Sequence, residues 1–243
     1  IDGTLIEPTM GNPGLEELKS FLLNRHDSTA FALASGRNLE LIKEAIEIHK
    51  LAIPDFIISS VGAEIYYTNG NDYILDKGWA SYLGGRWKRE DIYNRLKNIP
   101  WLKLQEEEAQ KEFKISFYYD ETKYSHDQLI TVLGPLWYRV SIIKSHGEFL
   151  DILPKRASKG NAIKFLSHKW SISLRDTFAC GDSGNDVDMF RAPIRGIIVG
   201  NKSEELNDIE QSKTVFLAKE PAASGILEGL AHYGVYDQAL VGK

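Results

Sequence analysis

The sequence predicts an α/β fold: a Rossmann-like core built on a parallel sheet, interrupted by an inserted α+β cap domain. Near both ends of the chain, short apolar runs alternate with stretches of helical periodicity, a pattern typical of parallel sheets. Between about Trp79 and Pro154 this pattern changes and aromatic residues become more frequent, and the alternation returns from Ser158. We therefore expect a core formed by residues 1–78 and 156–243, and a cap formed by residues 79–155.

Each expected element follows from the spacing of its apolar residues. In the first part of the core, helices are predicted at residues 15–23 and 39–49, and strands at residues 29–34 and 55–60. In the cap, a helix at residues 125–133 separates strands at residues 113–119 and 138–143. In the second part of the core, helices are predicted at residues 159–170 and 187–190, and strands at residues 177–180 and 196–199. Because strands alternate with helices in the core, its sheet should be parallel.

Composition restricts the classes of protein that fit. Of the 243 residues 26% are charged, and the net charge is −5. The chain therefore lacks the excess of basic residues that is typical of nucleic-acid-binding proteins. Cys180 is the only cysteine, which excludes a disulfide within the chain and fits a reducing compartment. No signal segment and no apolar run near the roughly 18 residues of a membrane helix is present. We expect a cytoplasmic protein without nucleic-acid or membrane partners.

An acidic turn, residues 180–186, is the strongest indication of chemistry. Asp182, Asn185 and Asp186 follow a short apolar run within five residues of one another. Hard oxygen ligands at the end of a buried strand suit Mg²⁺, which commonly shares its coordination sphere with a phosphate. The alternative is an ordinary connection in which these side chains cap the following helix.

Three further motifs stand at the ends of predicted strands or the starts of helices, where open α/β sheets bind their ligands. They are residues 2–4, residues 35–37 and residues 157–161. Together with the acidic turn they resemble the motifs of haloacid-dehalogenase-like phosphatases. This resemblance implies phosphoryl transfer with Mg²⁺ as the cofactor, held by Asp2, Asp182 and Asp186.

In that family the first motif has two aspartates separated by one residue, the first a nucleophile and the second a general acid and base. Asp2 fits the second position, so the nucleophile is expected directly before Ile1. Because the sequence begins within the motif, we expect an upstream residue to be missing. A chemically modified aspartate at that place is a further hypothesis. For Asp2 the plain alternative is a residue of an Asp-Gly turn.

The resemblance also assigns the other motif residues. Ser35 and the amide of Gly36 would bind a phosphoryl oxygen, and Arg37 would orient this turn or the cap. Lys159 would neutralise the carboxylates around the phosphoryl group, and Asn185 would orient the phosphate or this lysine. Taken alone, Ser35 fits an ordinary helix N-cap and Lys159 a solvated lysine.

Other sequence segments are similar to the sucrose-phosphate phosphatase branch of the family. The segments that carry this resemblance are residues 60–66, 114–118, 151–154 and 225–227. It implies that Gly62, Glu64, Lys114 and Tyr118 bind sugar hydroxyls, although Glu64 and Lys114 also fit plain surface charges. The branch tends to have histidine where this chain has Tyr118. The expected substrate is a disaccharide phosphate, first sucrose 6-phosphate and next mannosylfructose phosphate or a related sugar phosphate.

A different class of function also fits part of the sequence pattern. Chains of this branch also resemble modules fused to sucrose-phosphate synthases, where such a domain serves binding or assembly, with the synthase as partner. Against this interpretation, the chain has five charged or polar side chains that cost free energy to bring together in one site. They are Asp2, Ser35, Lys159, Asp182 and Asp186.

Overall fold

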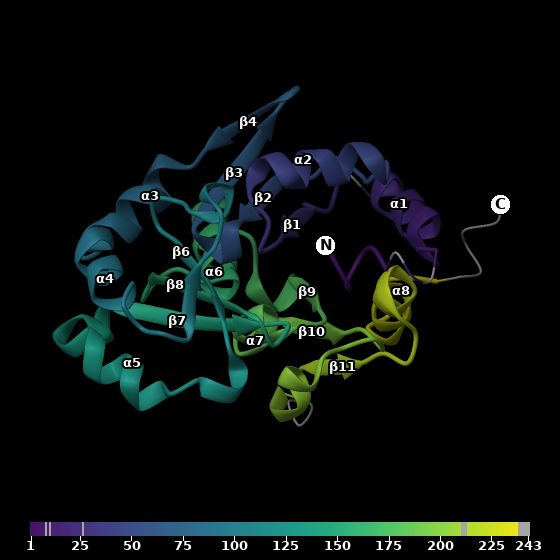
Figure 1. The fold of residues 1–243 in the computed structure, drawn as a ribbon. Helices are drawn as coiled ribbons and strands as arrows, with labels where there is room; N and C mark the ends of the chain where they lie inside the picture. Colours follow the sequence, from purple (N-terminus) through teal and green to yellow (C-terminus); the bar gives the residue numbers. More distant parts are fainter. Residues whose placement is uncertain (8, 10, 26, 210–212, 238–243) are drawn as a thin grey trace.

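The structure is a computed structural model that describes residues 1–7, 9, 11–25, 27–209 and 213–237. Its core contains two sheets, and a third sheet belongs to the cap (Figure 1). The sequence predicted one parallel core sheet. Within the described residues no strand joins the two core sheets, which instead share one hydrophobic cluster.

The first core sheet is only partly parallel. Its strands, in spatial order, are β1 (Ala32–Ala34), β2 (Phe56–Ser59), β3 (Glu64–Asn69) and β4 (Asp72–Leu75). β1 and β2 are parallel, whereas β2, β3 and β4 are antiparallel neighbours. Ser60 and Val61 adopt positive φ angles of 52° and 60°, and the chain reverses there. Because of this reversal, β3 and β4 run antiparallel to their neighbours, and within this sheet β1 and β2 keep the parallel arrangement that the sequence predicts.

The second core sheet is parallel throughout. Its strands, in spatial order, are β11 (Val215–Leu217), β10 (Arg195–Ile198) and β9 (Phe178–Gly181). The core helices are α1 (Leu15–Asn24), α2 (Leu39–Ile48), α6 (Lys159–Trp170), α7 (Val187–Phe190) and α8 (Ala222–His232). The side chains of Asn38 and Ser158 cap α2 and α6 by accepting hydrogen bonds from the third residue beyond each. The predicted bounds of α6 and α7 are confirmed.

The cap is a four-stranded antiparallel sheet with helices packed against one face. Its strands, in spatial order, are β5 (Leu102–Leu104), β6 (Ile115–Tyr119), β8 (Phe149–Pro154) and β7 (Val140–Ser145). α4 (Arg89–Leu96) and α5 (His126–Leu133) contribute to the same buried cluster as Ile115, Phe117 and Ile152. Since side chains alternate along a strand, the residues between these positions face the other way. Ser116 and Asp151, which are register partners, therefore lie on the opposite face of the sheet.

Apolar contacts tie the cap to the core. Trp79 and Leu83 of α3 (Lys77–Gly84) share one buried cluster with Ile58 and Ile65 of the core sheet and with Leu153 of the cap. The domain division expected at residue 79 falls inside this helix. Short 3₁₀ helices complete the fold: η1 (Ser60–Gly62), η2 (Glu107–Ala109), η3 (Glu121–Lys123), η4 (Gly134–Arg139), η5 (Leu174–Asp176), η6 (Gly184–Asp186) and η7 (Glu204–Ile209). Among the described helices, none combines the length and the apolar character needed to cross a membrane.

Candidate active site

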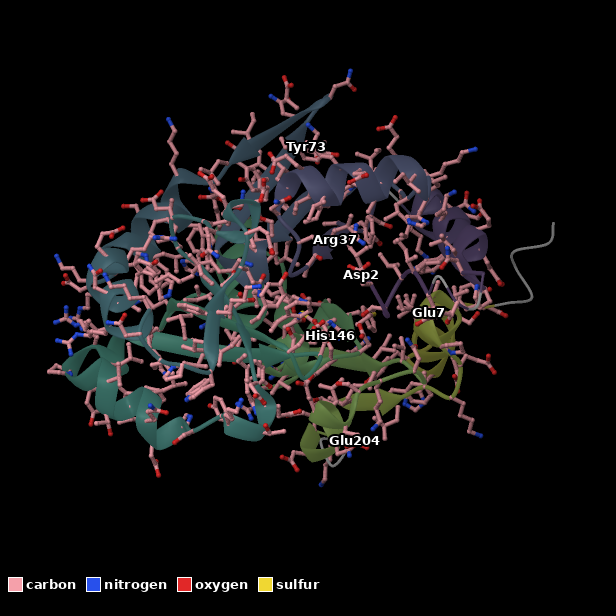
Figure 2. All side chains as sticks on the ribbon, in the orientation of Figure 1. Asp2, Glu7, Arg37, Tyr73, His146 and Glu204 are labelled. Atoms are coloured by element: carbon pink, nitrogen blue, oxygen red, sulfur yellow. The ribbon has the colours of Figure 1, made fainter. Side chains whose placement is uncertain are left out.

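A cavity of about 400 Å³ lies where core and cap face each other, a volume typical of small-molecule sites. The core lines it with Ile1, Asp2, Thr4, Ser35, Gly36, Arg37, Asn38, Leu41, Val61, Lys159, Asp182, Ser183, Asn185 and Asp186. The cap lines it with Gln105, Glu106, Glu108, Ala109, Lys114, Ser145, His146, Phe149 and Asp151. Figure 2 shows Asp2 and Arg37 near the centre of the molecule, with His146 of the cap close by in that view. All four predicted motifs thus contribute to one cavity.

Asp2 forms a bidentate ion pair with Arg37. The Nε and Nη2 atoms of Arg37 donate to the two carboxylate oxygens of Asp2 at 2.7 and 2.6 Å. Partial burial alone would raise the pKa of Asp2, but the hydrogen bonds from Arg37 hold it below its ordinary value. Arg37 also donates to the carbonyl oxygen of Leu41 in α2. The arginine therefore orients Asp2 rather than leaving its guanidinium free for an anion.

Ser35 lies at the end of β1 and is almost fully buried. Its Oγ accepts a hydrogen bond from the backbone N–H of Arg37 at 3.1 Å. Because that bond uses a lone pair, the hydroxyl proton of Ser35 is free to be donated into the cavity. Gly36 follows, and Asn185 lies next to it. This turn presents donors suited to an anion.

Lys159, at the first position of α6, is buried beside two residues of the acidic turn. Its Nζ donates to Oδ1 of Asp186 at 2.7 Å, and it also donates to the side-chain carbonyl of Asn185. The other oxygen of Asp186 accepts from the backbone N–H groups of Asp182 and Ser183 at 3.0 and 3.2 Å. Both oxygens of Asp186 are thus engaged within the protein. This carboxylate fixes the turn and the ammonium of Lys159.

Asp182 is the carboxylate best placed for a cation. It is 7% exposed, lines the cavity and accepts a hydrogen bond from the hydroxyl of Thr4. Burial, and then the negative charge of Asp186, raise the pKa of Asp182. A cation beside this carboxylate would offset both effects, so the donor chemistry fits a divalent ion. Among the described residues, however, no group of three or more acidic, histidine or cysteine side chains could hold a metal by itself.

Similarity to known proteins identifies the family of this chain. The sequence matches the family described as sucrose-6F-phosphate phosphohydrolase over residues 1–234. The chain belongs to this family. Its relatives include a probable sucrose-phosphatase 2 of Arabidopsis thaliana, 36% identical over a 222-residue match, with 86% of this chain and 51% of the relative covered. Another relative is a mannosylfructose-phosphate phosphatase of Agrobacterium fabrum, 32% identical over 83% of this chain and 82% of that protein.

Solved structures show the same fold. A sucrose-phosphatase from Synechocystis sp. PCC6803, solved in complex with sucrose and phosphate, is 33% identical and has a TM-score of 0.87, with 96% of this chain and 95% of that chain covered. A haloacid dehalogenase-like hydrolase protein of Bacillus subtilis has a TM-score of 0.69 at 20% identity, over 98% of this chain and 90% of that chain. The prediction of a haloacid-dehalogenase-like α/β core with a cap is confirmed. The chain spans about half the length of the plant relatives it matches.

Three predicted sugar ligands lie outside the residues that line the cavity: Gly62, Glu64 and Tyr118. Glu64 accepts hydrogen bonds from the hydroxyls of Ser59 and Ser60 and so supports the reversal between β2 and β3. The hydroxyl of Tyr118 donates to Glu106 at 2.9 Å at the protein surface. The fourth predicted ligand, Lys114, does line the cavity.

Other cavity residues were not predicted. They are Ile1, Thr4, Val61 and Ser183 beside assigned motif residues, Asn38 and Leu41 at the start of α2, and the cap residues Gln105, Glu106, Glu108, Ala109, Ser145, His146, Phe149 and Asp151. The sequence did point to Asp151, because this residue begins the segment 151–154 that contributed to the family resemblance. The short polar segment of residues 105–109 carries no comparable pattern. Its place in the cavity depends on the path of the cap chain.

Proposed function

We propose that this chain hydrolyses the phosphomonoester of a disaccharide phosphate, with sucrose 6-phosphate as the first substrate and mannosylfructose phosphate as the second. The observation that carries the proposal is the cavity itself. Its core side holds Asp2, Ser35, Lys159 and Asp182, and its cap side is lined by polar groups. Phosphoryl chemistry on one side and hydroxyl recognition on the other suit a phosphorylated sugar. Membership of the family and the similarity to phosphatases of two disaccharide phosphates support this choice.

In this proposal the phosphoryl group is transferred to the aspartate that we expect directly before Ile1. As general acid and base, Asp2 would donate a proton to the departing sugar oxygen and then take one from the water that attacks the phosphorylated aspartate. Because the ion pair with Arg37 favours the ionised form of Asp2, this role requires that the pair open and Asp2 take up a proton when the substrate binds. The hydroxyl of Ser35 donates to a phosphoryl oxygen, and the ammonium of Lys159 balances its negative charge. Asn185 and Asp186 hold that ammonium in place. Arg37 keeps the carboxylate of Asp2 pointed at the cavity.

Phosphatases of this superfamily generally depend on a metal ion. We propose Mg²⁺, with Asp182 as a direct ligand, Asp186 acting through water or through the turn it organises, and Asp2 close by. When bound, Mg²⁺ would neutralise the charge that develops on the phosphoryl oxygens.

Phosphate release from a panel of sugar phosphates tests the proposal. The wild-type protein should prefer the two disaccharide phosphates to glucose 6-phosphate and fructose 6-phosphate. A chelator should abolish this activity, and added Mg²⁺ should restore it. If the wild type hydrolyses none of these esters, a binding or assembly role beside a sucrose-phosphate synthase becomes the better interpretation.

The variant Asp182→Asn keeps the shape of the side chain but removes its charge, so kcat should fall by at least about 100-fold. Asp72→Asn is the matched control, because Asp72 is an exposed carboxylate on β4, outside the cavity lining. This control should retain full activity. Activity that persists in Asp182→Asn would reject the assigned metal ligand.

A further inference from the structure

A row of aromatic and basic side chains crosses the surface where α3, α6 and β3 meet. Neighbouring members of the row lie within 6.4 Å of each other, measured between ring centroids or from a cation to a ring centroid. In order, the members of this aromatic–basic strip are Arg156, Tyr82, Phe165, Lys169, Tyr67 and Trp170. None of them lines the cavity of the candidate active site. A role for the strip would therefore be separate from the chemistry of that cavity.

Two rings of the strip are exposed and yet held in place. Tyr82 is 46% exposed and Trp170 is 49% exposed. Tyr82 stacks on the buried ring of Trp79, with the centroids 5.6 Å apart, and the guanidinium of Arg156 lies 4.5 Å from the centroid of Tyr82. Trp170 packs against Phe56 of β2 at 5.6 Å between centroids. Because these neighbours already restrict both side chains, a partner that covers them would lose little side-chain entropy.

The exposed charges around the strip have a single sign. Within α3, α6 and the loop of residues 155–158, no exposed residue is acidic, and the exposed lysines and arginine are Lys77, Lys155, Arg156, Lys164 and Lys169. Lys169 pairs with the buried Asp76, which caps α3. In the part of the chain that the structure describes, no carboxylate forms an ion pair with any of the other four. The chain as a whole has a net charge of −5, so this surface is opposite in sign to the molecule that carries it.

We propose that the aromatic–basic strip is a docking surface for an acidic segment of a partner protein. Asp or Glu side chains of that segment would lie beside the cations that lack an ion pair, and an apolar side chain would cover Tyr82 or Trp170. Tyrosine, tryptophan and arginine are the residue types that contribute most to binding energy at protein interfaces, and all three occur here. Charge complementarity sets the sign of the partner and guides it to this face, because the net negative charge of the molecule disfavours other faces.

A nucleic acid fits this surface less well than an acidic peptide segment does. Bases bind to protein surfaces by stacking on free aromatic faces, but the ring of Tyr82 already has Trp79 stacked on it and Arg156 over it. A phosphate backbone would also continue beyond the strip onto a molecule of net negative charge. A short acidic segment needs only the strip itself.

Selection from a phage-displayed library of random peptides, each of about 12 residues, tests the chemistry of the partner. The library is selected on the immobilised wild-type protein. The enriched peptides should contain more Asp and Glu than the starting library, together with an aromatic or aliphatic residue. The most enriched peptide, made synthetically, should bind the wild type with a Kd of about 1–100 μM, and added salt should weaken this binding. The measurement uses no substrate, so its result does not depend on the proposed function.

Charge-reversal variants locate the binding. Arg156→Glu combined with Lys164→Glu reverses two cations that lack an ion pair, so the Kd of the selected peptide should rise at least about tenfold. Lys43→Glu combined with Lys213→Glu is the matched control, because it changes the net charge equally at two exposed lysines outside the strip. This control should raise the Kd less than about twofold.

Aromatic variants test the apolar part of the surface. Trp170→Ala should raise the Kd about tenfold, as the loss of an exposed interface tryptophan does. If thermal unfolding shows that this variant folds poorly, Tyr82→Ser replaces it, with the same expected rise in Kd.

Three results would overturn the proposal. The first is a selection that enriches no peptides, or peptides without an excess of acidic residues. The second is a Kd that is the same for the wild type and the Arg156→Glu, Lys164→Glu variant, or that rises as much in the lysine control. The third is tighter binding of polyuridylate RNA or of phosphatidylserine vesicles than of every selected peptide, with that binding lost in the Arg156→Glu, Lys164→Glu variant.

Discussion

The backbone conformation of Gly62 sets how closely two loops of the candidate site approach each other. Gly62 has a φ angle of +91°, and a Cβ atom at this position would lie 2.3 Å from the carbonyl carbon of Ser158. Its carbonyl oxygen also accepts a hydrogen bond from the indole N–H of Trp79 at 3.1 Å. Gly62 therefore allows the backbone of Ser158 and Lys159 to approach closely, although Gly62 itself does not line the cavity.

Gly62→Ala should lower both stability and activity. The new methyl group would push Ser158 away, and the positive φ angle would add backbone strain, so the free energy of unfolding should fall by about 1–3 kcal/mol. Because Lys159 follows Ser158 directly, kcat for phosphate release should also fall. Urea unfolding and steady-state kinetics measure the two effects.

Gly70→Ala separates the clash from the strain. Gly70 also has a positive φ angle, +63°, but nothing lies within 4 Å of a Cβ atom built there. This variant should lose only the smaller conformational contribution, about 1 kcal/mol, and keep its kcat. Equal kinetic losses in the two variants would contradict the role assigned to Gly62.

The sequence alone predicted which core residues meet, because the rule behind that prediction is simple. Ser35 ends a buried strand, Lys159 begins a helix and Asp182 follows a strand, and such positions converge in open α/β sheets. Glu64 was harder to place, since the chain reverses just before it through three residues with positive φ angles, Ser60, Val61 and Gly62. No residue type in that segment other than glycine signals such a reversal. Placing Glu64 therefore required the three-dimensional path of the chain.

Among the secondary-structure elements, those with strong periodicity or clear caps were predicted well. α6 begins after the N-cap Ser158 and ends at Trp170, as expected. β8 was not predicted as a strand, because its run Phe149–Pro154 is interrupted by the charged residue Asp151 and ends in proline. Its pairing with β6 is what places Asp151 at the cavity. The cap side of the site was thus less accessible to sequence reasoning than the core side.

The side chain that caps the start of α2 links the core to the cap. Asn38 accepts a hydrogen bond from the backbone N–H of Leu41 at 2.9 Å and so caps the helix. Its Nδ2 donates to the carbonyl oxygen of Glu108 in the cap at 3.1 Å. These two bonds use different atoms of the amide, so they can be removed separately.

Asn38→Asp should weaken the contact between cap and core while sparing the helix. Aspartate caps helices as well as asparagine does, but it has no N–H to donate to Glu108. KM for the sugar phosphate should rise about 2- to 10-fold, and thermal stability should change little. Asn38→Ala, the companion variant, should lose the helix cap as well and unfold at a lower temperature. A KM for Asn38→Asp equal to that of the wild type would argue against this link.

At the level of the whole molecule, the two core sheets depend on one shared hydrophobic cluster. Leu33 and Ile57 of the first sheet, Ile197 of the second and Leu18 of α1 all belong to it. Tyr236, near the end of the described chain, joins the same cluster and packs edge-on against Phe21 at 5.6 Å between ring centroids. Contacts between residues so distant in sequence cannot be predicted from local periodicity.

The hydroxyl of Tyr236 also donates a hydrogen bond to Glu17 of α1, and this makes stability depend on pH in the alkaline range. Burial, and then the hydrogen bond to Glu17, raise the pKa of Tyr236 to about 12 from an ordinary value of 10.0. The folded chain therefore keeps a proton that the unfolded chain releases above pH 10. The contribution is complete below pH 10 and is lost as the pH rises toward 12.

Tyr236→Phe should lower the free energy of unfolding by about 1 kcal/mol at neutral pH, because Glu17 loses its donor. Between pH 10 and pH 12 the variant should lose less stability than the wild type, since it has no phenol to titrate at this position. Tyr119, whose pKa is also raised to about 12, titrates in both proteins and so cancels in the comparison. Urea unfolding at a series of pH values measures the difference, and parallel curves for the two proteins would show that Tyr236 does not couple the C-terminal segment to α1.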